Sequence, residues 1–140
     1  MASTPLSIRF EHELLDRLRL AAQRRDTTPS GLAQRLIDEG LRIQEVPGIV
    51  FRDGPSGRRA GLPYGPDVWE VVAALKESDP RGDAAVNAVA EDLSLTPGAV
   101  HIAMSYYGAY PDEIDSEVAA NRAAAESALQ SWEAQRRLLT

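Results

Sequence analysis

Cysteine is absent from this 140-residue chain, and only two histidines are present. Without cysteine the chain can form no disulfide bond, no thiolate metal site and no cysteine nucleophile. The histidines, His12 and His101, lie far apart, and neither has a companion at the spacing of a metal site or a catalytic triad. We therefore expect no bound metal, no cofactor and no enzymatic activity.

Long apolar runs are missing as well. No run approaches the roughly 20 residues that span a bilayer, and residues 1–5 lack the charged and apolar regions of a signal peptide. We therefore expect a cytoplasmic protein with no membrane contact. A length of 140 residues and an apolar content of 44% leave room for one domain or for two small ones.

Residues 6–10 alternate between apolar and polar side chains. Their period of two is that of a β-strand, with Leu6, Ile8 and Phe10 on one face and Ser7 and Arg9 on the other. A lone strand of this length finds no partner for its backbone donors and acceptors within the first 45 residues. The pattern therefore predicts a two-stranded ribbon formed by two copies of the chain.

Two amphipathic helices are predicted after this strand. The first runs from His12 to about Arg25, and the second starts at Thr28 and Pro29. A threonine oxygen can cap free amides, and proline is tolerated in a first turn. The apolar stripes of both helices and the apolar face of the strand predict a dimer core, which comprises Leu6, Ile8, Phe10, Leu14, Leu18, Leu32, Leu36, Ile37 and Leu41.

The order of one strand and two helices in residues 1–45 resembles the ribbon-helix-helix family of DNA-binding proteins. The resemblance implies that the ribbon enters the major groove, where Arg9 can pair with guanine and Ser7 with several bases. It also implies that the start of the second helix grips a DNA phosphate. The candidate residues for that contact are Thr28, Ser30 and Gly31. Taken by itself, the alternating stretch is also typical of an edge strand with a solvated arginine.

The charge of the chain is divided unevenly. Its net charge is −6, which is unusual for a protein that binds phosphates. Residues 1–45 carry seven cations and seven acids, whereas residues 46–140 carry eight cations and fourteen acids. DNA binding is therefore expected in the first third of the chain.

Residues 46–140 are predicted to form a second, mainly helical domain. Residues 49–52 and 58–62 flank a turn-rich loop, which is typical of a short β-hairpin. Helices are predicted over about 65–78, 83–92, 96–109 and 112–139. The fold class is therefore mainly α: an N-terminal ribbon-helix-helix and a small helical domain with a short hairpin, divided between residues 45 and 46.

Residues 46–120 resemble a small bacterial domain of antitoxins that are paired with PIN-like ribonuclease toxins. The resemblance is carried by Leu95-Thr96-Pro97, Val100, Tyr106-Tyr107 and the stretch from Pro111 to Asp115. The segment includes a helix-turn-helix-like unit, which alone would suggest a second DNA reader. Residues 82–121 contain no lysine or arginine, however, and a helix without cations would repel phosphates. We interpret this unit as a surface for packing or protein contact.

The last predicted helix begins with a cluster of acidic residues at 112–117. Carboxylates complement the positive end of a helix dipole, so this placement indicates a structural role and not a metal site. At its other end, aromatic, aliphatic and arginine side chains are mixed as at interface hot spots. The candidate partner-binding residues are Trp132, Arg136, Arg137, Leu138 and Leu139. Packing of Trp132 on its own chain or on a dimer mate is an equally good alternative.

The two resemblances together imply a bacterial antitoxin of a type II toxin-antitoxin pair. Such a protein binds operator DNA as a dimer, represses its own promoter and neutralises a PIN-like ribonuclease. One alternative is a stand-alone transcriptional or plasmid-maintenance regulator. Another is a dimerising adaptor that never binds DNA.

Overall fold

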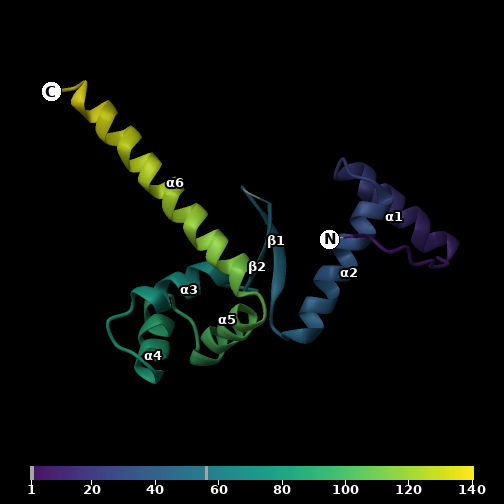
Figure 1. The fold of residues 1–140 in the computed structure, drawn as a ribbon, viewed down its shortest axis with the longest axis horizontal. Coiled ribbons are helices and arrows are strands. Elements are labelled where there is room, and N and C mark those ends of the chain that lie inside the picture. Colours follow the sequence, from purple (N-terminus) through teal and green to yellow (C-terminus); the bar gives the residue numbers. More distant parts are fainter. Residues whose placement is uncertain (1, 56) are drawn as a thin grey trace. The chain divides into compact units, whose positions relative to one another are not determined.

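The computed structural model describes residues 2–55 and 57–140. In these residues it contains six α-helices and one two-stranded antiparallel sheet (Figure 1), so the predicted mainly helical fold with a short hairpin is confirmed. Contacts along the chain divide it into two compact units, the first ending at Arg42 and the second beginning at Ile43.

The first unit holds α1 (His12–Arg24) and most of α2 (Pro29–Glu45). In the turn between them, Asp26 adopts a left-handed backbone with a φ of 52°, which aspartate tolerates better than most residues. Thr28 Oγ1 accepts a hydrogen bond from Gly31 N at 3.0 Å. The predicted threonine-proline start of the second helix is therefore confirmed. Within the described part of this unit, Ala22 and Leu32 are the buried apolar side chains.

Residues 2–11 form no strand, and both strands of the structure follow α1 and α2 in sequence. The predicted strand over residues 6–10 is therefore not formed in the single chain, which lacks the ribbon-helix-helix arrangement. The reason is that a strand needs a hydrogen-bonded neighbour, and the one sheet of the described chain pairs only the two later strands. Leu6, Ile8 and Phe10 are consequently exposed.

The second unit opens with the predicted hairpin. Strands β1 (Val50–Gly54) and β2 (Gly57–Gly61) pair antiparallel, with Val50 opposite Gly61 and Arg52 opposite Arg59. At the turn, Gly57 has a φ of +119°, which a residue with a Cβ rarely adopts. Four helices follow, namely α3 (Val68–Glu77), α4 (Asp83–Asp92), α5 (Pro97–Ala109) and α6 (Pro111–Arg137).

Two of these helices begin at strong capping signals. Asp67 and Glu70 form a reciprocal capping box at the start of α3. Thr96 Oγ1 accepts a hydrogen bond from Ala99 N at 3.1 Å at the start of α5, and Pro97 occupies the first helical position. The predicted start at Thr96 is therefore confirmed. Between α4 and α5, Ser94 turns the chain with a φ of 57°.

The core of the second unit lies between the hairpin and its helices. Tyr106 is the largest fully buried side chain, and its ring meets the Phe51 ring edge-on at 6.2 Å. Its hydroxyl donates a hydrogen bond to Glu113 Oε2 at 2.6 Å, which satisfies the buried oxygen. Aliphatic side chains from the hairpin and all four helices surround it: Ile49, Ala60, Leu62, Val68, Val71, Val72, Val86, Val89, Val100, Ile114 and Val118.

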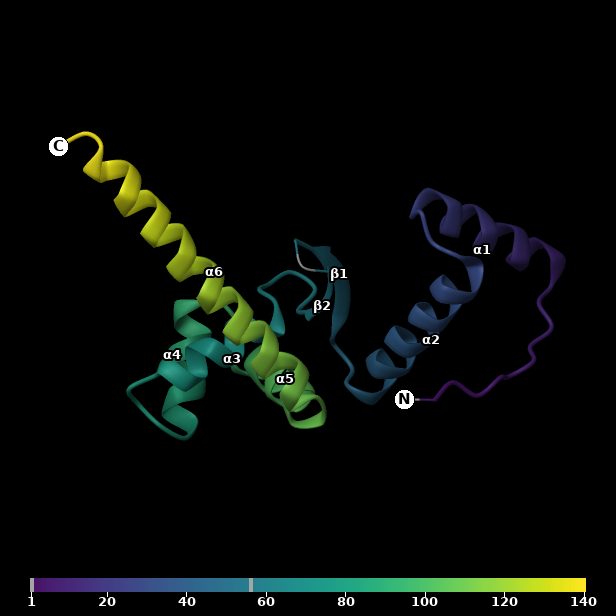
Figure 2. The same ribbon diagram turned by 45° about the horizontal axis from the view of Figure 1, so that its top comes forward.

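Helix α6 belongs to this core only through its first part, where Ile114 and Val118 are buried. From Arg122 to Thr140 every residue is exposed. Both views show the rest of α6 running away from α3, α4 and α5 (Figures 1 and 2). Although α6 is long, no helix among the described residues is both long and apolar enough to cross a membrane.

Candidate DNA-binding and partner-binding surfaces

The first unit presents an exposed apolar face. Leu6 is 81% exposed and Leu36 and Leu41 are each about half exposed. An open groove of about 680 Å³ runs between the N-terminal segment and α2, with Ile8, Phe10 and Ile37 among its lining residues. Leu14 is also exposed, and Leu18 is partly so. Of the predicted dimer-core residues, Leu32 differs, because it is already buried within the single chain.

The predicted base-reading residues lie in the same N-terminal segment. Ser7 and Arg9 are both exposed and belong to no helix or strand. The segment alone does not hold them in a fixed geometry for reading bases. A second strand beside it would be needed to fix their alternation.

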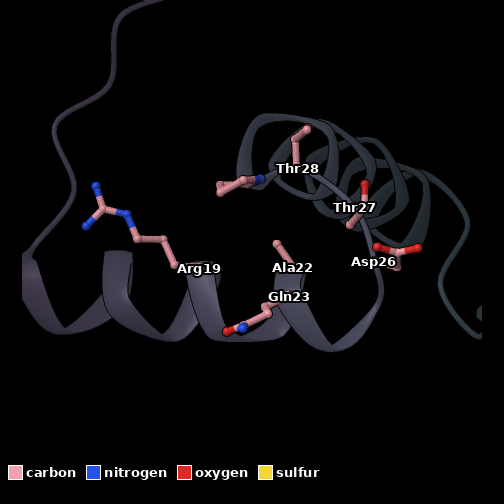
Figure 3. A pocket seen from close by; sticks show the side chains of 7 residues that line it. Arg19, Ala22, Gln23, Asp26, Thr27 and Thr28 are labelled. Carbon is pink, nitrogen blue, oxygen red and sulfur yellow. The ribbon is translucent and has the colours of Figure 1, made fainter.

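The start of α2 borders a hollow of about 510 Å³ (Figure 3), lined by Arg19 and Gln23 of α1 and by Thr27 and Thr28. We expected Gly31 to offer a free amide donor, but this amide already donates a hydrogen bond to Thr28 Oγ1. Ser30 is exposed, and its amide remains the candidate donor. Sequence reasoning missed Arg19, although its position one turn before Ala22 and Gln23 places it on the side of the hollow.

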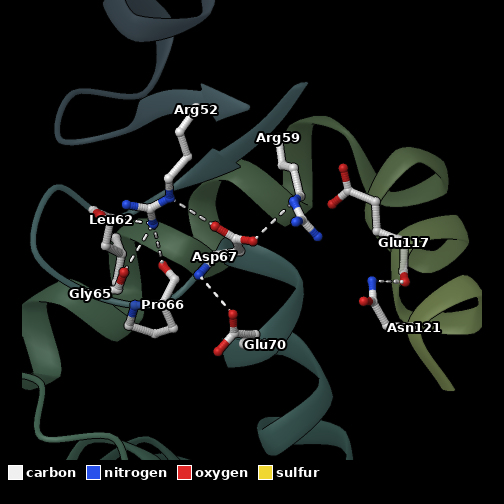
Figure 4. A network of polar contacts seen from close by, with 9 residues as sticks. All are labelled: Arg52, Arg59, Leu62, Gly65, Pro66, Asp67, Glu70, Glu117 and Asn121. Atoms are coloured by element: carbon white, nitrogen blue, oxygen red, sulfur yellow. Dashed lines mark hydrogen bonds and ion pairs between the residues drawn. The ribbon is translucent and has the colours of Figure 1, made fainter. Parts of the chain in front are cut away.

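The arginines of the hairpin are held by pairs within the second unit (Figure 4). Arg52 Nε lies 2.9 Å from Asp67 Oδ1, and Arg59 Nε lies 3.2 Å from Asp67 Oδ2. Arg52 Nη2 also donates to the carbonyl oxygens of Leu62, Gly65 and Pro66 at 2.9 to 3.2 Å. These contacts fix the loop between β2 and α3. They were missed because the partners are eight to fifteen residues apart in sequence, beyond the reach of local signals.

Glu117 of α6 lies beside this network and is incompletely satisfied. Its Oε2 atom is buried and has no hydrogen-bond partner among the described residues. Burial raises the pKa of this carboxyl to about 7, the nearby Glu113 and Asp67 carboxylates raise it too, and Arg59 lowers it. Its own backbone carbonyl accepts a hydrogen bond from Asn121 Nδ2 at 2.8 Å.

The other carboxylates at the start of α6 make structural contacts. Asp115 Oδ1 accepts hydrogen bonds from Lys76 Nζ at 2.6 Å and from the Tyr107 hydroxyl at 2.9 Å. The Lys76 hydrogen bond is the largest cause that lowers the pKa of Asp115. In residues 2–55 and 57–140 no group of carboxylates and histidines converges in a way that could hold a metal ion. The carboxylates instead tie α6 to α3 and α5.

At the position of the predicted helix-turn-helix-like unit, the turn at Ser94 joins α4 to α5. His101 and Met104 are exposed on α5. The helices and turns over residues 82–121 contain no cation. This surface therefore lacks the lysine and arginine side chains that neutralise phosphates.

Three candidate partner-binding residues, Trp132, Arg136 and Arg137, lie on the uncovered end of α6, and Leu138 and Leu139 follow it. Trp132 is 54% exposed, and Leu138 and Leu139 are each 85% exposed. The Arg136 guanidinium lies over the Trp132 ring, 5.1 Å from its centre, in a cation–π contact. Trp132 thus packs on a neighbouring arginine of its own helix and not on the core of its unit.

The candidate DNA-binding surface, the first of the two, lies in the first third of the chain. The candidate partner-binding surface, the second, lies at the end of the last helix and just after it. The first surface combines unpaired backbone, apolar side chains and arginines, and the second combines one aromatic ring with leucines and arginines. Comparisons of the chain with protein-family models, with curated proteins and with solved structures gave no match.

Proposed function

We propose that the chain is the antitoxin of a type II toxin-antitoxin pair, acting in the cytoplasm as a dimer. The observation that carries this proposal is the uncovered apolar face of the first unit, which borders an unpaired extended segment. Ala22 and Leu32 are the buried apolar side chains of that unit among its described residues. So small a core does not stabilise about forty residues in water. The unit therefore needs a partner, and its unpaired segment favours a second copy.

Two copies can satisfy both needs at once. Antiparallel pairing of residues 6–10 from each copy supplies the missing backbone hydrogen bonds. The same pairing turns Leu6, Ile8 and Phe10 of both copies towards the helices. Ser7 and Arg9 are then left on the free face of a ribbon, where they can reach base edges in the major groove.

At the start of α2 the helix dipole and Arg19 favour phosphate binding, whereas Asp26, which lines the same hollow, opposes it. The helix start carries a partial positive charge, and the exposed Ser30 amide is available as a donor. Arg19 lines the adjacent hollow, so its guanidinium can approach the same phosphate. The hairpin arginines are held by Asp67 and Asp53, which leaves DNA binding to the first unit.

The end of α6 supports the second half of the proposal, which is binding to a toxin. Interface hot spots are enriched in tryptophan and arginine, and Trp132, Arg136 and Arg137 lie together on an uncovered helix. A PIN-like ribonuclease has a metal-dependent site rich in carboxylates. Arginine forms bidentate pairs with carboxylates, so Arg136 or Arg137 can block such a site.

Two other functions agree with the same surfaces. A stand-alone transcriptional or plasmid-maintenance regulator would bind DNA without any toxin. A dimerising adaptor would form the same dimer without binding DNA. A neighbouring gene for a small nuclease would favour the antitoxin over the stand-alone regulator. A gel shift of DNA by the protein in moderate salt would exclude the adaptor that does not bind DNA.

The decisive experiment is a titration of the full chain against DNA from upstream of its own gene. Arg9→Ala is expected to weaken binding by about 1 to 3 kcal/mol and to flatten the preference among bases. Arg122→Ala is the matched control, because Arg122 is an exposed arginine of the second unit, and its affinity should equal that of the unaltered protein. Unchanged affinity and preference in Arg9→Ala would show that the ribbon does not read DNA.

A further inference from the structure

A glycine stands at the centre of the exposed apolar face of α2. Gly40 shares this face with Leu36, Ile37 and Leu41, which are all about half exposed, because these positions are close together at 3.6 residues per turn. A Cβ built on Gly40 meets no described atom within 4 Å. The single chain therefore has room for a side chain where the sequence has none.

Neither backbone geometry nor a helix end explains this glycine. Gly40 is not among the residues with a positive φ, so alanine can adopt the same conformation. It lies five residues before the end of α2 at Glu45, too early for a C-terminal cap. Glycine inside a helix is less stable than alanine, so Gly40 carries a cost in stability that a close helix contact would offset.

We propose that α2 of a second copy crosses α2 at Gly40, so that the two glycines face each other across the two-fold axis. This inference rests on the dimer proposed above and specifies its helix contact. In a two-fold interface the same patch meets itself, so one small residue removes two side chains from the crossing point. The helix axes can then approach to the short end of the roughly 8 to 10 Å that is usual between packed helices.

The charges of α2 agree with this orientation. The face around Gly40 is free of charged side chains, while Asp38 and Arg42 lie on the other side of the helix and pair at 3.2 Å. A second copy can therefore cover the apolar face without burying an ion.

The absence of cysteine allows a direct test by cross-linking. Gly40→Cys in the full chain is expected to give a covalent dimer on mild oxidation, because a disulfide needs Cα atoms within roughly 4.4 to 6.8 Å of each other. Asp38→Cys, on the opposite side of the same helix, is the matched control and should remain uncross-linked. A non-covalent dimer that fails to cross-link through Gly40→Cys would overturn the proposed crossing.

A second substitution, Gly40→Ala, distinguishes a helix crossing at Gly40 from a solvated face, because it weakens the dimer in the first case and stabilises the helix in the second. If the helices cross at Gly40, Gly40→Ala is expected to raise the dimer dissociation constant at least tenfold in sedimentation measurements. If the face is merely solvated, the same change should leave the dimer intact and stabilise the helix, which overturns the inference. Gly108→Ala is the control, since a Cβ there also meets no described atom within 4 Å and Gly108 belongs to the second unit.

These outcomes separate the crossing from the proposed function. A protein that dimerises and binds DNA with its affinity unchanged by Gly40→Ala refutes only the crossing. An unaltered protein that is monomeric and binds no DNA refutes the proposed function, and the crossing with it.

Discussion

Glu117 offers the sharpest test of how the second unit is stabilised. The substitution is Glu117→Gln, which keeps the size of the side chain and removes its charge. Because burial raises the pKa of Glu117 from an ordinary 4.5 to about 7, the folded protein holds this proton more tightly than the unfolded chain does. The contribution of the protonated Glu117 carboxyl to the free energy of unfolding is therefore fully present below pH 4.5. It falls as the pH rises to about 7, and it is lost above that pH.

The magnitude follows from the size of the pKa shift. One pKa unit corresponds to about 1.4 kcal/mol, so a rise from 4.5 to about 7 sets a ceiling of about 3.4 kcal/mol. The carboxyl group is partly open to solvent, which screens it, so we expect Glu117→Gln to gain about 1 to 2 kcal/mol at pH 8. For a unit of this size that gain raises Tm by about 5 to 10 °C. At pH 5 the gain should be smaller by about 1 kcal/mol.

Tryptophan fluorescence during thermal unfolding provides the assay, because Trp69 and Trp132 both belong to the second unit. Glu126→Gln is the matched control: it removes a carboxylate from the exposed part of α6 and should leave the stability unchanged at both pH values. Equal gains for Glu117→Gln at pH 5 and pH 8 would refute the reasoning, as would a loss of stability at pH 8.

Two further predictions concern the loop after the hairpin and the end of α6. Arg52→Met should destabilise the second unit by about 2 kcal/mol, because it removes the donor of Asp67 Oδ1 and of the Gly65 carbonyl, while the Leu62 and Pro66 carbonyls keep only their backbone donors. Arg122→Met should cost less than about 1 kcal/mol, since its pair with Glu77 is exposed. Urea unfolding measures both. Truncation after Ala128 removes Trp132, and in a pull-down the truncated chain should no longer capture the protein encoded by the neighbouring gene. Its DNA binding should be unchanged. Capture by the truncated chain would contradict the role given to Trp132.

Much of the secondary structure could be predicted because its signals are local. Thr28-Pro29 and Thr96-Pro97 each place a capping oxygen and a tolerated proline at a helix start, and the structure begins α2 and α5 at these prolines. The hairpin was likewise marked by its turn-rich loop. Such signals act over three or four residues and need no knowledge of the tertiary fold.

Long-range contacts could not be predicted in the same way. Arg52 and Asp67 are fifteen residues apart, and Lys76 and Asp115 are thirty-nine apart. Nothing in either local sequence selects the partner, because many other pairs of opposite charge are equally possible before the chain folds. Glu117 shows the same limit, since only the packing of α6 buries its carboxyl and raises its pKa.

The predicted strand at residues 6–10 shows a third kind of limit. Its alternation describes which side chains would share a face, but the hydrogen bonds that make a strand come from a neighbour. That neighbour is proposed to be a second chain. A structure of one chain therefore leaves Leu6, Ile8 and Phe10 exposed, and the oligomeric state in solution is the quantity that decides the ribbon.

The alanine content of α6 explains how its second half stays helical without a core to pack against. The stretch from Arg122 to Arg137 extends about 24 Å at 1.5 Å per residue, and all of it is exposed. Alanine has the highest helix propensity, and the buried first part of α6, around Ile114 and Val118, removes the cost of starting a new helix. A partner that binds Trp132 and Arg136 would therefore meet a preformed helix and would lose little affinity to the ordering of the chain.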